Sequence, residues 1–324
     1  MEYTRLGSTG LEVSRLCLGC MSFGTPDDER PWVLETDAAR PIFRKAWEAG
    51  INFYDTANVY AKGSSEEVTG KVLKELGRRD EIVIATKVFG RMRPGPNGQG
   101  LSRASIMMEI DNSLRRLGVD YVDLYQIHRW DKITPIEETM EALHDVVQAG
   151  KARYIGASSM YAWQFSEALR ASDLNGWTRF VSMQDEVNLN YREEEREMLP
   201  LCDYEGIGVL PWSPLGGGKL TRPWGEATKR GTTDRYNKTM YEETDGNARG
   251  VVEAIETVAK ARGVPMAQVA LAWVMQKDVV TAPIVGASKV SHVEDALAAM
   301  EIELTDAEVA ALEAPYTPRK IRGF

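Results

Sequence analysis

The sequence contains little cysteine, no long apolar run and no excess of positive charge. Three cysteines among 324 residues are too few for a disulfide framework in a protein of this size. No uninterrupted apolar stretch approaches the roughly 20 residues of a membrane-spanning helix, and the start, MEYTRLGSTG, lacks the basic and apolar regions of a secretory signal. A net charge of −9 argues against a partner with a phosphate backbone. We therefore expect a soluble, cytoplasmic protein with no nucleic-acid or membrane partner.

What the sequence does contain is a regular alternation of short apolar segments and helical patterns. Near-continuous apolar runs are typical of parallel strands covered on both faces, and they predict strands at residues 15–21, 51–56, 81–87, 122–128, 152–158, 180–184, 206–212 and 281–287. Residues 64–67 and 305–308 have the pattern of a capping box at a helix start. Pro135 is expected at the first position of a helix that stops at Gly150.

Eight strands, each followed by a helix or a long loop, predict a (β/α)₈ TIM barrel that forms one domain over residues 1–324. The segment ahead of the first strand is expected to be a hairpin that covers the barrel floor. The alternative is an open doubly wound sheet, but LGCMSFG at 18–24 does not fit its G-x-G-x-x-G fingerprint. Two long loops, 90–101 and 213–246, follow the third and seventh predicted strands, on the side where barrels build their sites.

Three ionisable residues end successive predicted strands. Asp55, Lys87 and His128 close the second, third and fourth strands, about one βα unit apart, and Tyr60 follows Asp55 in its loop. In a closed barrel the strand ends meet at one rim, so these four side chains are predicted to form a cluster. Any one of them alone would more often be an ordinary hydrogen-bonded strand-end residue.

The residue types of this cluster suit proton transfer to a carbonyl oxygen. A phenol has a reference pKa near ~10, and we expect the ammonium of Lys87 to lower the pKa of Tyr60. Asp55 would pair with Lys87, and His128 would orient a carbonyl group. No metal-ligand set accompanies them and no side chain supplies hydride, so reduction would require a nicotinamide cofactor. A Schiff base at Lys87, as in aldolase barrels, is an alternative.

Four segments, GINFYDTANVY, ATKV, DYVDLYQIH and RYIGASS, resemble the aldo-keto reductase superfamily, and the likeness extends over essentially the whole chain. Within it the chain looks most like bacterial reductases of the YajO type, relatives of the potassium channel β subunits. The resemblance implies NADPH-dependent reduction of aldehydes and ketones by a catalytic tetrad of Asp55, Tyr60, Lys87 and His128, with Tyr60 as the general acid. It also leaves open a nucleotide-sensing binding subunit with little turnover, because such subunits keep the tetrad.

The same resemblance implies a set of cofactor-binding residues. They are Gly19, Cys20, Met21, Asp55, Ser158, Ser159, Gln184, Trp212, Ser213, Leu215, Gly217, Lys219, Ile284, Gly286, Ser288, Lys289 and His292. Ser288 and Lys289 match the pair that contacts the adenosine 2′-phosphate, so NADPH is favoured over NADH. The chain departs from the family at Ser159, where asparagine is usual, and at Asp295-Ala296, where the usual motif ends in Glu-Asn.

The expected substrate pocket includes Phe23, Phe89 and Trp130, an aromatic lining that suggests aryl or medium aliphatic aldehydes. No metal site is expected, and oligomerisation is not required. Cys17 and Cys20 form a C-x-x-C pattern, but residues three apart on a strand point to opposite faces, so both are predicted to be ordinary buried residues. The run Gly216-Gly217-Gly218-Lys219 fails the full phosphate-loop pattern.

Overall fold

The computed structural model describes residues 1–226 and 245–322, and its centre is an eight-stranded parallel sheet. The strands lie in the order β10-β3-β4-β5-β6-β7-β8-β9, each beside its neighbour in the chain except where the last meets the first. Their bounds are β3 (Cys17–Gly19), β4 (Phe53–Asp55), β5 (Val83–Val88), β6 (Val122–Ile127), β7 (Ala152–Ser158), β8 (Phe180–Gln184), β9 (Gly208–Val209) and β10 (Ile284–Gly286).

The sheet curls until its two ends meet. The backbone N–H of Thr281 donates to the carbonyl of Val209 at 2.9 Å, and that of Ile284 donates to Pro211 at 2.8 Å. These bonds join the β9 side to the β10 side, so the predicted (β/α)₈ barrel is confirmed and the open doubly wound sheet is wrong. Strands β3, β4, β9 and β10 are shorter than the apolar runs that predicted them. Near β9 and β10, Pro211 and Pro283 lack the N–H needed to extend the hydrogen-bonded ladder.

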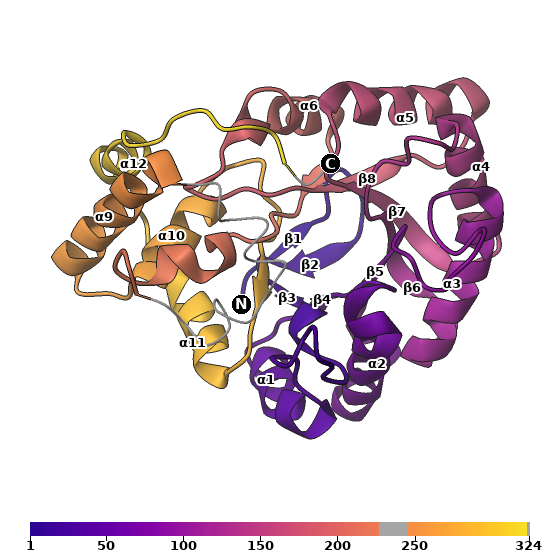
Figure 1. Ribbon diagram of the computed structural model, residues 1–324, viewed down its shortest axis with the longest axis horizontal. Coiled ribbons are helices and arrows are strands. Elements are labelled where there is room, and N and C mark those ends of the chain that lie inside the picture. Colours follow the sequence, from indigo (N-terminus) through magenta and orange to yellow (C-terminus); the bar gives the residue numbers. More distant parts are fainter. Residues whose placement is uncertain (227–244, 323–324) are drawn as a thin grey trace.

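Helices form an outer layer around the strands (Figure 1). Their bounds are α1 (Thr36–Glu48), α2 (Ser64–Leu76), α3 (Arg103–Leu117), α4 (Ile136–Gln148), α5 (Ala162–Asn175), α6 (Met198–Glu205), α9 (Asp245–Arg262), α10 (Met266–Met275), α11 (Val290–Ala299) and α12 (Asp306–Glu313). No helix within the described ranges is long and apolar enough to cross a membrane.

Alternation along the strands divides the core into two parts. Cys17 and Phe53 belong to a small cluster inside the barrel, whereas Leu18, Cys20 and Tyr54 belong to the larger cluster between strands and helices. Successive side chains of a strand point to opposite faces, and covering both faces requires the near-continuous apolar runs seen in the sequence. Cys17 and Cys20 are therefore free, buried and directed into different clusters, as predicted.

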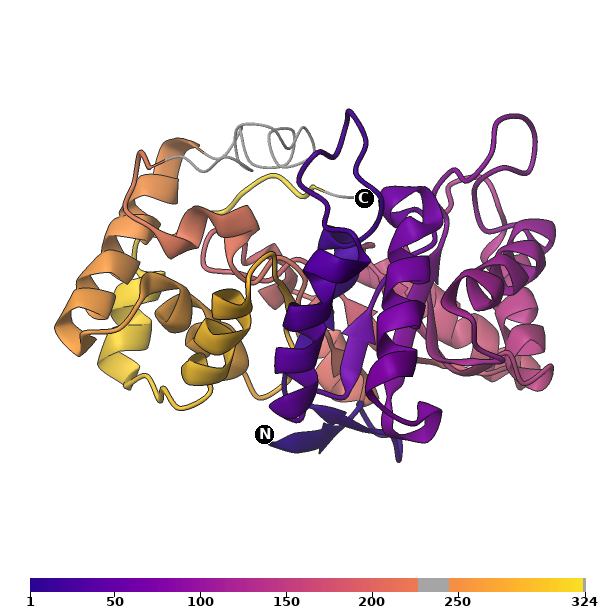
Figure 2. The same ribbon diagram turned by 90° about the horizontal axis from the view of Figure 1, so that it is seen from below.

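A two-stranded antiparallel hairpin, β1 (Tyr3–Arg5) and β2 (Glu12–Ser14), precedes the barrel. Leu6 and Val13 of this segment are fully buried in the interior cluster. Figure 2 shows the hairpin at one end of the barrel, opposite the end at which loop 90–101 projects. The predicted cover of the barrel floor is therefore confirmed.

The expected helix starts had mixed outcomes. Thr305 caps α12 as predicted, with its hydroxyl accepting from the N–H of Glu308 at 3.3 Å. The capping box at 64–67 is wrong: Gly63 is the N-cap of α2, and the Ser64 hydroxyl instead donates to the carbonyl of Ala61 at 2.8 Å. Pro135 is the N-cap of α4 and not its first helical residue, and α4 ends at Gln148, two residues before Gly150.

Both long loops follow the carboxyl ends of their strands. Loop 90–101 starts beyond β5 and is closed at its base by a bond from Gly100 N to the carbonyl of Phe89 at 2.8 Å. The second loop contains the short helix η5 (Gly216–Thr221). Its residues 227–244 lie outside the described part of the chain, so only its first portion is described near the site.

Candidate active site

The four predicted cluster residues come from adjacent strands at one end of the barrel. Asp55 is the last residue of β4, Lys87 lies one residue from the end of β5, and His128 directly follows β6. Tyr60 begins the short helix η2 (Tyr60–Gly63). The intervening loop is tied back to β5, because Asn58 N donates to the carbonyl of Lys87 at 3.1 Å.

The ammonium of Lys87 joins three of the four. Its Nζ donates to Asp55 Oδ1 in a short ion pair, to the carbonyl of Thr56 at 2.9 Å and to Tyr60 Oη at 3.4 Å. The side chains of Lys87 and Asp55 are 0% and 2% exposed. A buried ammonium with three oxygen partners is held in one place, and it presents its positive charge to the phenol.

The second oxygen of Asp55 is held by two amides. Gln126 Nε2 and Gln184 Nε2 each donate to Asp55 Oδ2 at 3.0 Å, and Gln184 also donates to Gln126 Oε1 at 3.2 Å. Asp55 is therefore hydrogen-bonded at both oxygens. This network extends from β4 through β6 to β8 and fixes the position of Lys87.

Burial decides the ionisation of the phenol. Removal from water raises the pKa of Tyr60, and this outweighs the charge of Lys87, which lowers it. The expected net lowering is therefore wrong for this structure. Burial would lower the pKa of Lys87, but the charges of Asp55 and Tyr60 raise it overall. At neutral pH the site holds a protonated phenol beside an ammonium.

His128 completes the cluster from the other side of Tyr60. The two rings meet edge to face, with centroids 5.6 Å apart, and His128 N donates to the carbonyl of Val88 at 2.8 Å. Burial, followed by the charges of Arg129 and Lys87, holds the pKa of His128 well below its usual value. The imidazole is thus neutral near pH 7 and can donate a hydrogen bond from one ring nitrogen. Both Tyr60 and His128 remain partly exposed at the barrel mouth.

A second group of predicted residues adjoins the tetrad. The Ser158 hydroxyl donates to the carbonyl of Gln184 at 2.8 Å, and the indole N–H of Trp212 donates to Ser159 Oγ at 3.0 Å. Ser159 has a left-handed φ of 49°, a conformation that asparagine adopts more readily than serine. Since Gln184 also bonds Asp55, the predicted carboxamide-binding residues and the tetrad form one connected network.

The remaining predicted cofactor residues lie on three rim segments. The first is the β3–β10 pair, where Gly19 faces Gly286 in register and a side chain on Gly19 would collide with Ile284. Cys20 and Met21 continue this segment in the short helix η1 (Cys20–Ser22). The second segment runs into η5 and holds Ser213, Leu215, Gly217 and Lys219, the last two within η5. The third runs into α11 and holds Ser288, Lys289 and His292, the last within α11.

Residues 295–296, where the chain departs from the usual family motif, make contacts within the protein. Asp295 accepts a hydrogen bond from Gln268 Nε2 at 3.0 Å, and Ala296 is buried in the core. Glu294, the residue before them, pairs with Lys45 of α1 at 3.0 Å. The two acidic side chains of this motif are therefore engaged with neighbouring helices.

A cavity of about 570 Å³ lies between loop 90–101 and the segment after β6, which begins next to His128 in the chain. It is lined by Phe89, Asn97, Gln99, Gly100, Ser102, Arg129, Trp130, Asp131, Lys132, Ile133 and Thr134. Two of the predicted pocket residues, Phe89 and Trp130, thus line this cavity. Phe23 does not, because it is fully buried against Phe43, with ring centroids 4.8 Å apart, and belongs to the hydrophobic layer.

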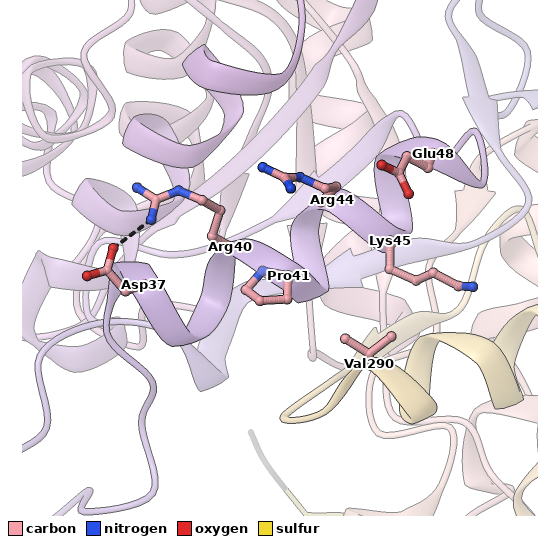
Figure 3. A pocket seen from close by; sticks show the side chains of 7 residues that line it. All are labelled: Asp37, Arg40, Pro41, Arg44, Lys45, Glu48 and Val290. Carbon is pink, nitrogen blue, oxygen red and sulfur yellow. Dashed lines mark hydrogen bonds and ion pairs between the residues drawn. The ribbon is translucent and has the colours of Figure 1, made fainter.

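A second hollow, of about 320 Å³, lies between α1 and α11 and contains none of the predicted site residues (Figure 3). Its basic side chains are largely paired: Arg40 with Asp37 at 2.6 Å, and Lys45 with Glu294. Its residues are Asp37, Arg40, Pro41, Arg44, Lys45, Glu48 and Val290. This hollow therefore lies apart from the hydrogen-bonded cluster.

Sequence reasoning missed three residues of the site: Gln126, Arg129 and Asp185. Gln126 was recognisable, because it lies two positions before His128 on the same strand and hence on the same face. Asp185 is fully buried, with Oδ1 accepting from Ser159 N at 3.0 Å and Oδ2 without a hydrogen-bond partner. Burial raises the pKa of Asp185 to about 7. No local pattern marked Asp185 or Arg129.

The amino-acid sequence is similar to those of known proteins over nearly its whole length. A sequence model of the aldo/keto reductase family matches residues 15–316. Versiconal hemiacetal acetate reductase of Aspergillus parasiticus is 42% identical over 341 residues, covering 99% of this chain and 98% of that protein. A putative aryl-alcohol dehydrogenase of Schizosaccharomyces pombe is 42% identical over 346 residues, covering 99% and 97%. An aldo-keto reductase of Fusarium vanettenii is 42% identical over 347 residues, covering 100% and 93%.

Proposed function

The chain belongs to the aldo/keto reductase family, and we propose that it is a single-domain reductase that converts aldehydes or ketones to alcohols with NADPH. The family uses nicotinamide cofactors, and its members named above are reductases and a putative dehydrogenase. The proposal depends mainly on two hydrogen bonds of the buried Lys87 ammonium, one to Asp55 and one to the Tyr60 phenol. The three relatives are fungal, so a place among the YajO-type bacterial reductases stays a prediction.

The chain's own residues supply the proton and its control. Tyr60 Oη donates its proton to the substrate oxygen. A bound NADPH would supply the hydride for the carbonyl carbon. The phenolate that remains is stabilised by Lys87, 3.4 Å away. The neutral His128 donates a second hydrogen bond to the same oxygen and orients the carbonyl. Asp55 holds Lys87 in position, and the two glutamines hold Asp55.

The donor chemistry of the rim fits such a cofactor. Hydroxyls of Ser158 and Ser159 and the amide of Gln184 suit the nicotinamide carboxamide, and the partly exposed Trp212 offers an aromatic face. Three successive glycines, 216–218, have positive φ and lead into Lys219, an arrangement suited to phosphate. Lys289, exposed at the start of α11, would select the 2′-phosphate of NADPH over NADH.

Two other functions would use residues of the same site. A Schiff base requires an uncharged lysine, but Lys87 is paired with Asp55 and its pKa is raised, which opposes that chemistry. A nucleotide-sensing subunit would keep the same tetrad, so geometry does not separate it from a reductase. Turnover does: such a subunit binds NADPH tightly and leaves aldehydes unreduced.

The experiment compares wild type with Tyr60→Phe. Cofactor binding is followed by quenching of tryptophan fluorescence, and turnover by loss of NADPH absorbance with a panel of aromatic and aliphatic aldehydes. We expect the variant to bind NADPH normally and to lose about 10²–10⁴-fold in turnover, the usual contribution of a positioned acid. Tyr204→Phe, at an exposed tyrosine, is the matched control. Normal reduction by Tyr60→Phe would disprove the mechanism, and NADPH binding without wild-type turnover would favour the binding subunit.

A further inference from the structure

Two residues that line the cavity, Phe89 and Arg129, lie close in the chain to tetrad residues. Arg129 in its wall directly follows His128. Phe89 lies two residues after Lys87, and the residue after it, Gly90, packs on Val59, so that an added Cβ would lie 2.6 Å from Val59, the residue before Tyr60. A substrate whose carbonyl lies between Tyr60 and His128 would therefore extend its remaining groups into this cavity.

The charged groups of the cavity wall differ in the hydrogen bonds that they make within the protein. The carboxylate of Asp131 accepts from Leu101 N at 2.8 Å, Ile133 N at 2.9 Å and Thr134 Oγ1 at 2.8 Å, and these donors hold its pKa below the usual value despite partial burial. Asp131 thus ties the two walls together, and its hydrogen-bonding capacity is used locally.

Arg129 is differently placed. One of its guanidinium nitrogens donates to the carbonyl of His128 at 2.5 Å, and its guanidinium carbon lies 5.9 Å from the ring of Trp212. Within the described ranges no carboxylate forms an ion pair with Arg129 or with Lys132, which is exposed on the same wall. An arginine has five N–H donors, and the bond to the His128 carbonyl uses one of its guanidinium nitrogens.

The neighbouring loop adds charge of the same sign. Arg91 and Arg93 of loop 90–101 bond carbonyl oxygens of their own loop, and no described carboxylate neutralises them. A chain with net charge −9 thus has two basic residues in the wall of this cavity, Arg129 and Lys132, and two more in the loop that contributes to the wall. Like charges around a cleft attract an oppositely charged ligand and raise its local concentration.

The rest of the wall is apolar or aromatic. Phe89 and Trp130 face the cavity, Trp163 lies 6.0 Å from Trp130 between ring centroids, and Ile133 is 89% exposed at the rim. A ligand that matches both features has an aromatic body and an anionic group. Building on the proposed reductase function, we propose that this cavity selects aromatic aldehydes that carry a carboxylate, and that Arg129 binds the carboxylate.

The test uses two aldehydes of similar size, 4-carboxybenzaldehyde and its uncharged methyl ester. For wild type we expect kcat/KM to favour the acid by about 10-fold or more, as charge-assisted bidentate bonds to arginine are the strong ones. Arg129→Gln should bring the acid-to-ester ratio close to one, Lys132→Gln should reduce it less, and Arg129→Lys should retain part of it because charge remains without the planar fork. Arg170→Gln, an exposed arginine of α5, is the matched control and should leave the ratio unchanged.

Two further readouts separate this inference from the reductase proposal. NADPH affinity is measured for each variant, because Arg129 also lies near Trp212. Binding of 4-(hydroxymethyl)benzoate to the NADP⁺ complex is measured without turnover, and we expect Arg129→Gln to weaken it about 10-fold. If wild type reduces both aldehydes equally, or if Arg129→Gln weakens NADPH binding while the ratio persists, the anion-binding role is overturned and the reductase stands. Carboxylate binding that depends on Arg129 without reduction of any aldehyde would support the site and count against the reductase.

Discussion

Asp185 provides a test of how burial controls charge beneath the proposed nicotinamide site. Its carboxyl is fully buried, one oxygen accepts from Ser159 N, and the other has no hydrogen-bond partner. Its backbone carbonyl also accepts from Trp212 N at 2.8 Å, so the residue joins two strand ends. Asp185→Asn keeps the acceptor for Ser159 and removes the ionisable group.

The magnitude follows from the pKa of Asp185, which burial raises to about 7 in the folded protein, against a reference value of ~3.9 in an unfolded chain. A raised carboxyl pKa favours folding most below pH ~4, and this contribution is lost as the pH rises to about 7. Three pKa units correspond to about 4 kcal/mol over that interval. The pKa of the buried Glu194 is raised to about 9, and the charge of Asp185 contributes to this rise. The two carboxyls therefore titrate together, and the pH-dependent free energy of unfolding belongs to the pair.

The assay is urea unfolding of wild type and Asp185→Asn at pH 5 and pH 8. We expect the stability of the variant relative to wild type to grow by about 3 kcal/mol between these conditions, because most of the cost of ionising Asp185 falls within that interval. Asp203→Asn, at an exposed carboxylate of α6, should show no such growth. If the advantage of Asp185→Asn does not increase with pH, the buried carboxylate is satisfied in the folded protein and the reasoning is wrong.

Two other predictions concern Tyr60 and the contact between α2 and α3. Because the pKa of Tyr60 is raised, reductive turnover at saturating NADPH should hold to at least about pH 9 and fall only above the ordinary tyrosine range; a pH–rate profile that falls near neutrality would show that Lys87 outweighs burial. Gly70→Ala should cost about 2 kcal/mol or more in thermal unfolding, because the added Cβ would lie 1.9 Å from the carbonyl oxygen of Leu117. A variant as stable as wild type would show that the two helices separate at little cost.

The local sequence pattern was sufficient for the barrel. Eight apolar runs, the hairpin and the chain positions of Asp55, Lys87 and His128 are all features of short segments, and a barrel converts equal spacing along the chain into neighbouring positions on a rim. The helix cap at Thr305 could be predicted for the same reason. The cap predicted at Ser64 was wrong because the Ser64 hydroxyl donates its hydrogen bond to the carbonyl of Ala61.

The remaining features depend on neighbours that are distant in sequence. Phe23 was predicted to line the pocket, but it packs on Phe43, which is distant in sequence. Asp185 and Arg129 belong to no motif that the sequence shows. The sign of the Tyr60 pKa shift is the clearest case: the sequence could place a lysine near the phenol, but not weigh its charge against the loss of water. Residue order thus determined which groups reach the rim, because strand periodicity is local. The tertiary structure alone decided their ionisation and their free donors, because both depend on every atom packed around them.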